Sequence, residues 1–183
     1  ELGVERFYNK TCSVFRGNVG AEFDAMLDAL GERSAAVVLG FPKNGRVTKN
    51  GIHYVHGKKL EDSEFRHDPV HPMTESNLLR ILQAQTARSL SLVTHRTVEA
   101  GEAAVRAEWQ RLSRESAYVL FDVESQRDLE IIAKALYDCK VIGGSSALAE
   151  ELAALDPKAS LGSLTVPAAR PGLGTLVVAG SLM

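Results

Sequence analysis

The chain has 183 residues, 45% of them hydrophobic, which is enough to bury a complete core in one domain or in one domain and part of another. Its 21 basic and 23 acidic residues leave a formal charge of −2, which argues against nucleic acid or an anionic membrane as the partner and favours a small molecule. Cys12 and Cys139 lie far apart with no C-x-x-C spacing, which argues against a disulfide scaffold or structural zinc and favours a cytoplasmic location.

The first half of the sequence predicts a helix, a strand and a hairpin. An apolar stripe at helical spacing precedes Gly31, a residue type that commonly ends a helix. The stripe consists of Phe23, Met26, Leu27 and Leu30. Residues 35–39 form a continuous apolar run, as expected of a strand covered on both faces in a parallel sheet. Two strand-like pieces between Arg46 and Gly57 flank Lys49-Asn50-Gly51, and the Asn-Gly pair predicts a tight hairpin.

Residues 58–76 have no clean period and contain two prolines. We therefore expect a long ordered loop over the surface rather than part of the core. Loops of this kind often line binding sites.

Strands and helices alternate in the second half. The pattern predicts a helix entered through residues 74–77, a strand at 90–93, a helix around Trp109 and a strand at 118–121. Asp122 follows that strand, at the edge where open α/β sheets place their ligands.

The next predicted elements are a capped helix, a short strand and a helix that begins near Ala147. Ser125-x-x-Asp128 is a capping pattern, and residues 140–142 read as a strand that leads into residues 143–146, Gly-Gly-Ser-Ser. This turn can cradle a phosphate, or its glycines can serve close packing between strand and helix.

These elements predict an α/β fold with a Rossmann-like, mostly parallel sheet, flanking helices and an inserted β-hairpin. We expect one domain over residues 1–154, a linker over 155–174 and the first strand of a second domain at 175–183. The sequence starts without methionine and stops just after a strand-like run, so we expect both ends to be cut from something longer.

Residues 10–20 are the best candidate for a binding site, because a cation, hydroxyls and glycines come directly before a helix. N–H groups at a helix start are unpaired, and a guanidinium holds a carboxylate or phosphate with two parallel hydrogen bonds. We expect Arg16 and the backbone of Gly17 and Asn18 to bind a small anion, assisted by Lys10 and Ser13. Alternatively, the glycines only make turns, Arg16 is a solvated charge, and Ser13 or Asn18 caps the helix.

Cys12 and two histidines carry other chemistry. Cys12 can act as a nucleophile if nearby cations lower its pKa, but no Cys–His pairing is evident and a buried cysteine is commonly inert. His67-x-x-x-His71 contains metal-ligand types, yet Pro69 disfavours a helical pair and no third ligand is evident, so we expect no metal site.

Asp68 and Glu75 fall in the loop at 58–76. Both can accept hydrogen bonds from substrate hydroxyls, and both can equally be solvated loop carboxylates.

The order of motifs resembles the four-carbon acid sugar kinases, formerly a domain of unknown function, which include the 3-oxo-tetronate, threonate and erythronate kinases. The likeness covers about residues 4 to 181 and is specific only when its motifs are taken together. They are Lys10-Thr11-Cys12-Ser13, Arg16-Gly17-Asn18-Val19-Gly20, Phe41-Pro42-x-Asn44-Gly45-Arg46, Gly51-x-x-Tyr54-Val55-x-Gly57, Leu60, Glu64-Phe65-x-x-Asp68-Pro69-x-x-Pro72-Met73-Thr74-Glu75-Ser76 and Gly143-Gly144-Ser145. Many members have aspartate at the position of Cys12 and threonine at the position of Val14. A cysteine at the position of Cys12 is nevertheless similar to what some members have.

The resemblance implies an N-terminal domain that binds the sugar acid, a C-terminal domain that binds ATP with Mg²⁺, and phosphoryl transfer between them. This chain resembles most of the first domain, with the family's aspartate-rich turn upstream of Glu1 and its glycine-rich ATP motifs beyond Met183. The implied substrate-binding residues are Lys10, Ser13, Arg16, Gly17, Asn18 and Glu75. Ser181 matches a serine expected to meet ATP, while the general base and magnesium ligands are not assignable, so the fragment alone is expected to be inactive. A homodimer is compatible with this picture.

Two other functions stay open. Half of a two-domain enzyme can serve as a non-enzymatic, small-acid-binding or regulatory module. The strand and helix alternation also permits a nucleotide-dependent oxidoreductase, although no G-x-G-x-x-G follows any predicted strand.

Overall fold

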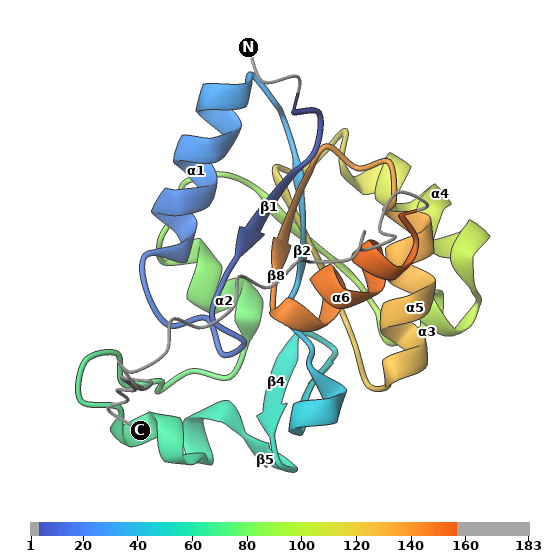
Figure 1. The fold of residues 1–183 in the computed structure, drawn as a ribbon. Coiled ribbons are helices and arrows are strands. Elements are labelled where there is room, and N and C mark those ends of the chain that lie inside the picture. Colours follow the sequence, from blue (N-terminus) through green and yellow to red (C-terminus); the bar gives the residue numbers. More distant parts are fainter. Residues whose placement is uncertain (1–3, 157–183) are drawn as a thin grey trace, which may run out of the picture.

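The structure, a computed structural model, describes residues 4–156 (Figure 1). Five strands form a parallel sheet in the order β1-β8-β2-β7-β6. They are β1 (Phe7–Lys10), β2 (Ala35–Val38), β6 (Leu90–Val93), β7 (Tyr118–Phe121) and β8 (Val141–Gly144). The predicted parallel sheet and four of its strands are confirmed, and β1 is a strand that the sequence pattern did not predict.

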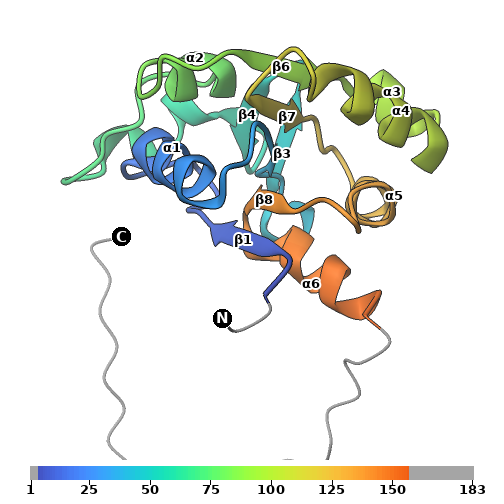
Figure 2. The same ribbon diagram turned by 90° about the horizontal axis from the view of Figure 1, so that it is seen from above.

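Helices cover both faces of this sheet (Figures 1 and 2). One face carries α1 (Val19–Leu30) and α2 (Leu78–Gln83). The other carries α3 (His95–Glu99), α4 (Glu102–Leu112), α5 (Gln126–Ala135) and α6 (Ser146–Ala154). The predicted helices are confirmed, and α3 is an additional short helix that ends just before Gly101, whose φ of 98° breaks it from α4. No helix among residues 4–156 is long and apolar enough to cross a membrane.

The continuous apolar runs predicted as doubly covered strands have that role. Along β2, Ala35 and Val37 pack with α1 and α2, whereas Ala36 and Val38 pack with the helices of the opposite face. This alternation follows from the two-residue period of side chains along a strand. Burying both faces explains why the run contains no polar residue.

The predicted hairpin is confirmed as β3 (Arg46–Lys49) and β4 (Ile52–Val55), which pair antiparallel. Asn50 and Gly51 have φ of 51° and 74°, the two positive values that a two-residue turn of this kind requires. A second such turn leads to a short strand, β5 (Lys58–Lys59), which pairs with β4 and was not predicted. The three strands form a separate small sheet.

The expectation of a surface loop over residues 58–76 is wrong in part. Most of the segment is irregular, with short 3₁₀ helices at Leu60–Asp62 and Glu64–His67. Leu60, Phe65 and Met73 are buried, however, and together with Val14 and Val55 they form a small core of their own. Their irregular spacing hid this core, because no helical or strand period marks it.

Candidate binding site

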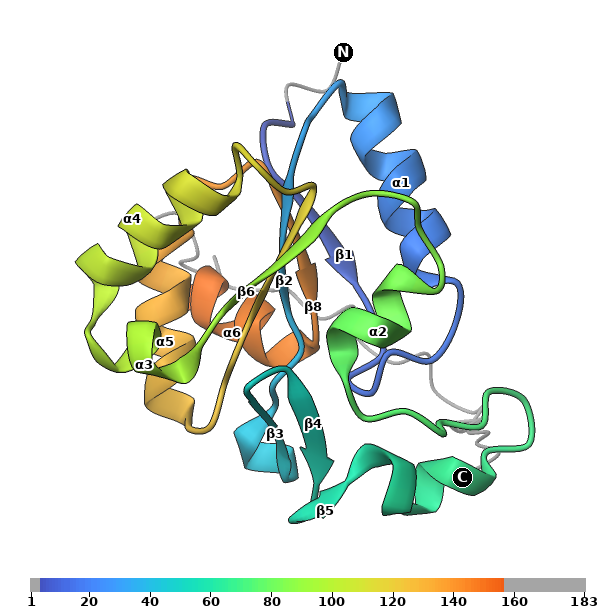
Figure 3. The same ribbon diagram turned by 180° about the vertical axis from the view of Figure 1, so that it is seen from behind.

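The small sheet lies at the carboxyl edge of the parallel sheet, the edge toward which β1 and β8 point in Figure 1. Thr48 of β3 and Val123, which follows β7, exchange two backbone hydrogen bonds of 2.7 and 3.0 Å. A further bridge joins Ile52 of β4 to Asn77, just ahead of α2. Figure 3 shows the small sheet below the parallel sheet in the view from behind. The hairpin therefore covers the edge at which open α/β sheets bind ligands.

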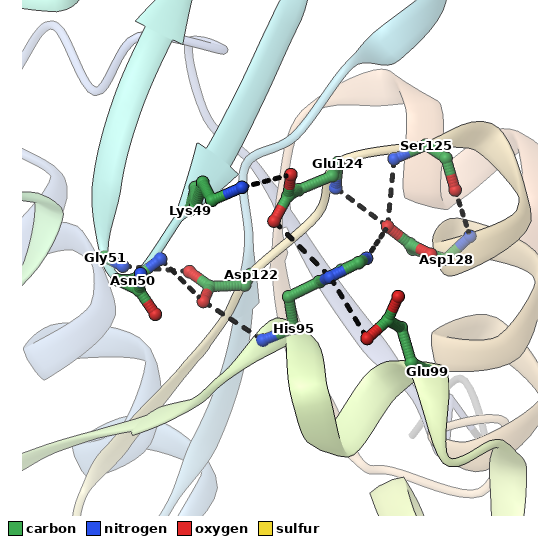
Figure 4. A network of polar contacts seen from close by, with 9 residues as sticks. All are labelled: Lys49, Asn50, Gly51, His95, Glu99, Asp122, Glu124, Ser125 and Asp128. Atoms are coloured by element: carbon green, nitrogen blue, oxygen red, sulfur yellow. Dashed lines mark hydrogen bonds and ion pairs between the residues drawn. The ribbon is translucent and has the colours of Figure 1, made fainter.

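Asp122 occupies the expected position at the carboxyl end of β7, but its carboxylate anchors the hairpin (Figure 4). It accepts hydrogen bonds from the N–H groups of Asn50 (2.8 Å), Gly51 (2.9 Å) and His95 (3.1 Å), and it is fully buried. Burial raises the pKa of Asp122, against the opposing effect of these donors. Because both of its oxygens accept backbone N–H groups, two of them from the hairpin turn, Asp122 anchors the hairpin to the parallel sheet.

A network of charged groups continues from Asp122 to the start of α5 (Figure 4). The His95 ring lies 3.4 Å from Glu124 and 3.2 Å from Asp128, and Glu124 also pairs with Lys49 at 3.2 Å. Asp128 caps α5 through the predicted capping box with Ser125, which is confirmed. The network joins the hairpin, α3 and α5.

Arg16 lies in the segment between β1 and α1, where its side chain is half-buried and makes three contacts with neighbouring side chains. Its Nη1 is 2.5 Å from Oδ2 of Asp68, its Nε donates to Sγ of Cys12 at 3.3 Å, and its guanidinium lies 5.2 Å from the centre of the Phe65 ring. It is therefore not a freely solvated charge. The structure brings together two sequence candidates, Arg16 and Asp68, that lie 52 positions apart.

The Asp68 carboxylate also accepts hydrogen bonds from the backbone N–H groups of Val70 (3.0 Å) and His71 (2.8 Å). The His71 N–H, the Arg16 guanidinium and the Val70 N–H lower the pKa of Asp68 to about 2. This charged, buried carboxylate fixes the loop at 68–71 and the position of Arg16.

The depressed pKa of Asp68 predicts an acid-dependent loss of stability. An aspartate in the unfolded chain titrates near pH 4, so between about pH 4 and pH 2 the unfolded state binds more protons than the native state. The stabilisation from Asp68 is thus complete above about pH 4 and is lost as the pH falls toward 2. In urea unfolding, the free-energy difference between the parent chain and Asp68→Asn should stay constant from pH 6 to pH 5 and shrink between about pH 4 and pH 2. A difference that stays constant would contradict this assignment.

Arg46, at the start of β3, is a site residue that sequence reasoning did not select. Its guanidinium lies 5.7 Å from the centre of the Phe65 ring, the same ring that Arg16 approaches, and its Nη1 donates to the carbonyl oxygen of Asn44. Its Nε is buried without a hydrogen-bond partner. Two guanidinium groups thus share one ring while Asp68 offsets a single positive charge. In the sequence, the only indication of a role for Arg46 was its position at the end of the family motif Phe41-Pro42-x-Asn44-Gly45-Arg46.

A pocket of about 350 Å³ lies between the segment before α1, the loop before α2 and α2 itself, and Arg16 is not part of its lining. It is lined by Phe15, Gly17, residues 70–75, Ile81, Ala84 and Gln85. Gly17 and Glu75, both predicted substrate contacts, therefore face one cavity. Gln85 accepts the N–H of Gly20 at 2.9 Å, which fixes the first turn of α1 against the pocket wall.

The other predicted contacts are placed less centrally. Glu75 accepts the N–H groups of Ser76 and Asn77, and the latter bond in particular lowers its pKa. Asn18 is exposed at the start of α1, and its side chain makes no capping hydrogen bond. Lys10 is exposed, with its Nζ 3.1 Å from the carbonyl oxygen of Thr11. Neither Lys10 nor Ser13 lines the 350 Å³ pocket.

Several other candidates take structural positions. Gly143 and Gly144 lie within β8 and are buried, and a Cβ on either would collide with Phe23 or with the backbone of Val38, so close packing explains both. His67 and His71 are exposed. Ser181, the predicted linker beyond Asp156 and the predicted strand at 175 lie outside the described residues.

A second hollow of about 290 Å³ lies beside β1 and α6, away from these residues. Its cation, Arg6, already contacts the carbonyl oxygen of Tyr137 at 3.0 Å and the carboxylate of Asp156 at 3.6 Å. This hollow contains none of the predicted contacts, so the pocket lined by Gly17 and Glu75 is the better candidate.

Comparison with known proteins identifies the family. A family model described as "sugar-binding N-terminal domain" matches residues 1–152. The chain belongs to this family. The predicted relation to the four-carbon acid sugar kinases is confirmed, because the curated relatives of this sugar-binding domain include several 3-oxo-tetronate kinases.

Three of these relatives show the extent of the match. The 3-oxo-tetronate kinase of Pectobacterium atrosepticum is 36% identical over 158 residues, which cover 84% of this chain and 37% of the relative. That of Escherichia coli is 37% identical, covering 84% and 41%. That of Actinobacillus succinogenes is 34% identical over 187 residues, covering 99% and 44%. The chain spans less than half the length of these relatives.

Solved structures agree with the fold. A Haemophilus influenzae protein of a domain-of-unknown-function family superposes with a TM-score of 0.79 at 32% identity, covering 82% of this chain and 38% of that one. A Bordetella bronchiseptica protein of the same family, solved with bound citrate as a domain-swapped dimer, gives a TM-score of 0.67 at 32% identity, covering 82% and 36%.

Proposed function

We propose that this chain is the sugar-acid-binding part of an ATP-dependent kinase that phosphorylates a four-carbon sugar acid such as 3-oxo-tetronate. The observation that carries the proposal is the pair of guanidinium groups, Arg16 and Arg46, at the Phe65 ring. Among residues 4–156, Asp68 is the only carboxylate that pairs with them. The names of the relatives support the substrate class, and the citrate bound to one solved relative supports a site for small carboxylic acids.

In this proposal the substrate carboxylate meets the positive charge that Asp68 leaves uncompensated. A carboxylate suits a guanidinium because two parallel N–H groups can donate to its two oxygens. The remaining hydroxyl-bearing carbons extend into the pocket beside Gly17, where Glu75 offers acceptor oxygens. The cavity of about 350 Å³ is ample for a four-carbon acid.

The nucleotide belongs to the remainder of the longer protein. Within residues 4–156 no group of three or more His, Cys, Asp or Glu side chains is placed to hold a metal ion. When bound, magnesium-ATP supplies the phosphoryl group that a substrate hydroxyl receives. The role of this chain is to bind the acid and to orient that hydroxyl. By analogy with the Bordetella protein, assembly as a homodimer is part of the proposal.

The activity is tested with the complete protein in a coupled ADP-release assay, with magnesium-ATP and a panel of four-carbon sugar acids. Turnover of one acid would support the kinase and name its substrate. No turnover, with acid binding still detectable by calorimetry, would contradict the kinase and support a non-enzymatic acid-binding module.

The site itself is tested by Arg46→Ala and Arg16→Ala in the same protein. Each should weaken binding of the acid about 10- to 100-fold, because a hydrogen bond to a charged group contributes about 1.5–3 kcal/mol. Calorimetry measures the affinity, and Arg114→Ala is the control, since Arg114 is exposed just before the opposite, amino end of β7. Unchanged affinity in both site variants would place the acid elsewhere.

A further inference from the structure

The polar side chains that line the pocket of about 350 Å³ differ in how firmly they are held. They are His71, Thr74, Glu75 and Gln85. His71 and Thr74 are exposed, whereas Glu75 and Gln85 are half-buried. The N–H groups of Asn77 and Ser76 lower the pKa of Glu75, so its carboxylate is ionised and can only accept hydrogen bonds. Gln85 is therefore the half-buried side chain of this lining that can donate.

Gln85 is fixed from two directions. Its backbone N–H donates to the carbonyl oxygen of Leu82 in α2 at 2.9 Å, and its Oε1 accepts the N–H of Gly20 in α1 at 2.9 Å. A Cβ at position 20 would lie 2.5 Å from Cβ of Gln85 and 2.8 Å from its carbonyl oxygen. The close approach of Gln85 to the first turn of α1 thus requires glycine at position 20.

The contact with Gly20 also decides which way the amide of Gln85 points. A backbone N–H can only donate, so the amide oxygen must face α1 and the NH₂ group must occupy the other branch. Among residues 4–156 neither hydrogen of Nε2 has an acceptor, and Nε2 is not enclosed by protein. Gln85 therefore offers a donor of fixed orientation to a molecule that fills the pocket.

We propose that Gln85 is a specificity-determining residue, whose Nε2 donates to the oxo oxygen of a 3-oxo sugar acid bound in this pocket. The inference rests on the proposed function, because it requires that the acid lies here. An oxo oxygen only accepts hydrogen bonds, whereas a hydroxyl also donates. A donor at Gln85 and an acceptor at Glu75 thus suit an acid that carries an oxo group beside hydroxyl groups.

The substitution Gln85→Glu separates this role from a structural one. One carboxylate oxygen can still accept the N–H of Gly20, while the second oxygen places an acceptor where Nε2 was a donor. Two acceptor oxygens repel each other, so an oxo group becomes unfavourable there, whereas a hydroxyl can donate to the new oxygen. The added charge repels the carboxylate of every sugar acid alike, so its effect cancels when two acids are compared.

The test is calorimetry on the complete protein at about pH 8, where a glutamate at position 85 is ionised. The probes are 3-oxo-tetronate and two acids with a hydroxyl in place of its oxo group, threonate and erythronate. We expect the ratio of affinities, oxo acid over hydroxy acid, to fall at least about tenfold in Gln85→Glu. Gln85→Met, which neither donates nor accepts at this position, should give an intermediate ratio. A loss of stability alone would lower both affinities and leave their ratio unchanged.

The control is Gln110→Glu, the same chemical change at an exposed residue of α4, on the opposite face of the parallel sheet. Its ratio should equal that of the parent protein, and a ratio that falls as far as in Gln85→Glu would overturn the inference. An unchanged ratio in both Gln85 variants would overturn the inference but leave the proposed function in place, since the parent protein would still bind the acid. If the parent protein binds none of the three acids, the proposed function and the role of Gln85 both fail.

Discussion

Replacement of Asp122 by alanine should detach the hairpin from the parallel sheet and destabilise the chain by at least about 3 kcal/mol. The carboxylate is fully buried and accepts three backbone N–H groups, from Asn50, Gly51 and His95. Leaving one buried donor unpaired costs about 1–3 kcal/mol, and alanine leaves all three unpaired. Urea unfolding measures the loss, and hydrogen exchange should show faster exchange of the Asn50 and Gly51 amides well before global unfolding.

The conservative variant sharpens this test. Oδ2 accepts from Asn50 and His95, whereas Oδ1 accepts only from Gly51. Asparagine with its carbonyl oxygen at the Oδ2 position keeps two of the three bonds, so Asp122→Asn should cost only about 1–3 kcal/mol. Asp138→Asn, at a carboxylate with 82% of its side chain exposed, should change stability by less than about 1 kcal/mol. Equal losses in all three variants would show that Asp122 does not anchor the hairpin.

The position of Asp122 was predictable, but its role was not. The apolar run at residues 118–121 placed Asp122 at the carboxyl end of a predicted strand, where ligands bind in open α/β sheets. Its actual partners are the turn residues Asn50 and Gly51, more than seventy positions earlier in the chain. Nothing local to either segment encodes this pairing, since it depends on how the small sheet docks.

The candidate binding site shows the same division between local and distant features. The prediction of an anion-binding cation ahead of a helix rested on local features, the glycines and the helix start. The pairing of Arg16 with Asp68, and the approach of Arg46 to the ring shared with Arg16, arise only when three distant segments converge on Phe65. The loop at 58–76 was misjudged for the same reason, because its buried residues fit no period.

The hairpin links the two halves of the carboxyl edge. On one side Asp122 and the His95 network tie its turn to α3 and α5 (Figure 4). On the other side β4 contributes Val55 to the core that also holds Phe65, below Arg16. Because one rigid element contacts both sides, we expect changes at Asp122 to reach the guanidinium pair through the hairpin.

Gly144 of β8 should be the least replaceable residue of this edge, and Gly144→Ala should prevent stable folding. Its φ of 151° is rare for residues with a side chain, and a Cβ there would overlap the carbonyl oxygen of Val38 on the adjacent strand β2. Backbone on both sides leaves no flexible side chain to move aside, because Gly144 also pairs with Lys10 of β1. We expect the free energy of unfolding to fall by more than about 4 kcal/mol, a loss that single substitutions reach only when they disrupt the core or the backbone.

Gly101→Ala is the matched control, because it separates the collision from the backbone strain. Gly101 also has a positive φ, 98°, but a Cβ there meets nothing within 4 Å. Gly101→Ala should therefore destabilise the chain only by the conformational strain, about 1–3 kcal/mol, and leave it folded. Circular dichroism and urea unfolding of both variants measure the two costs. If Gly144→Ala folds with a stability close to that of Gly101→Ala, then β2 and β8 can separate locally, and the carboxyl edge is more adaptable than this close strand pairing implies.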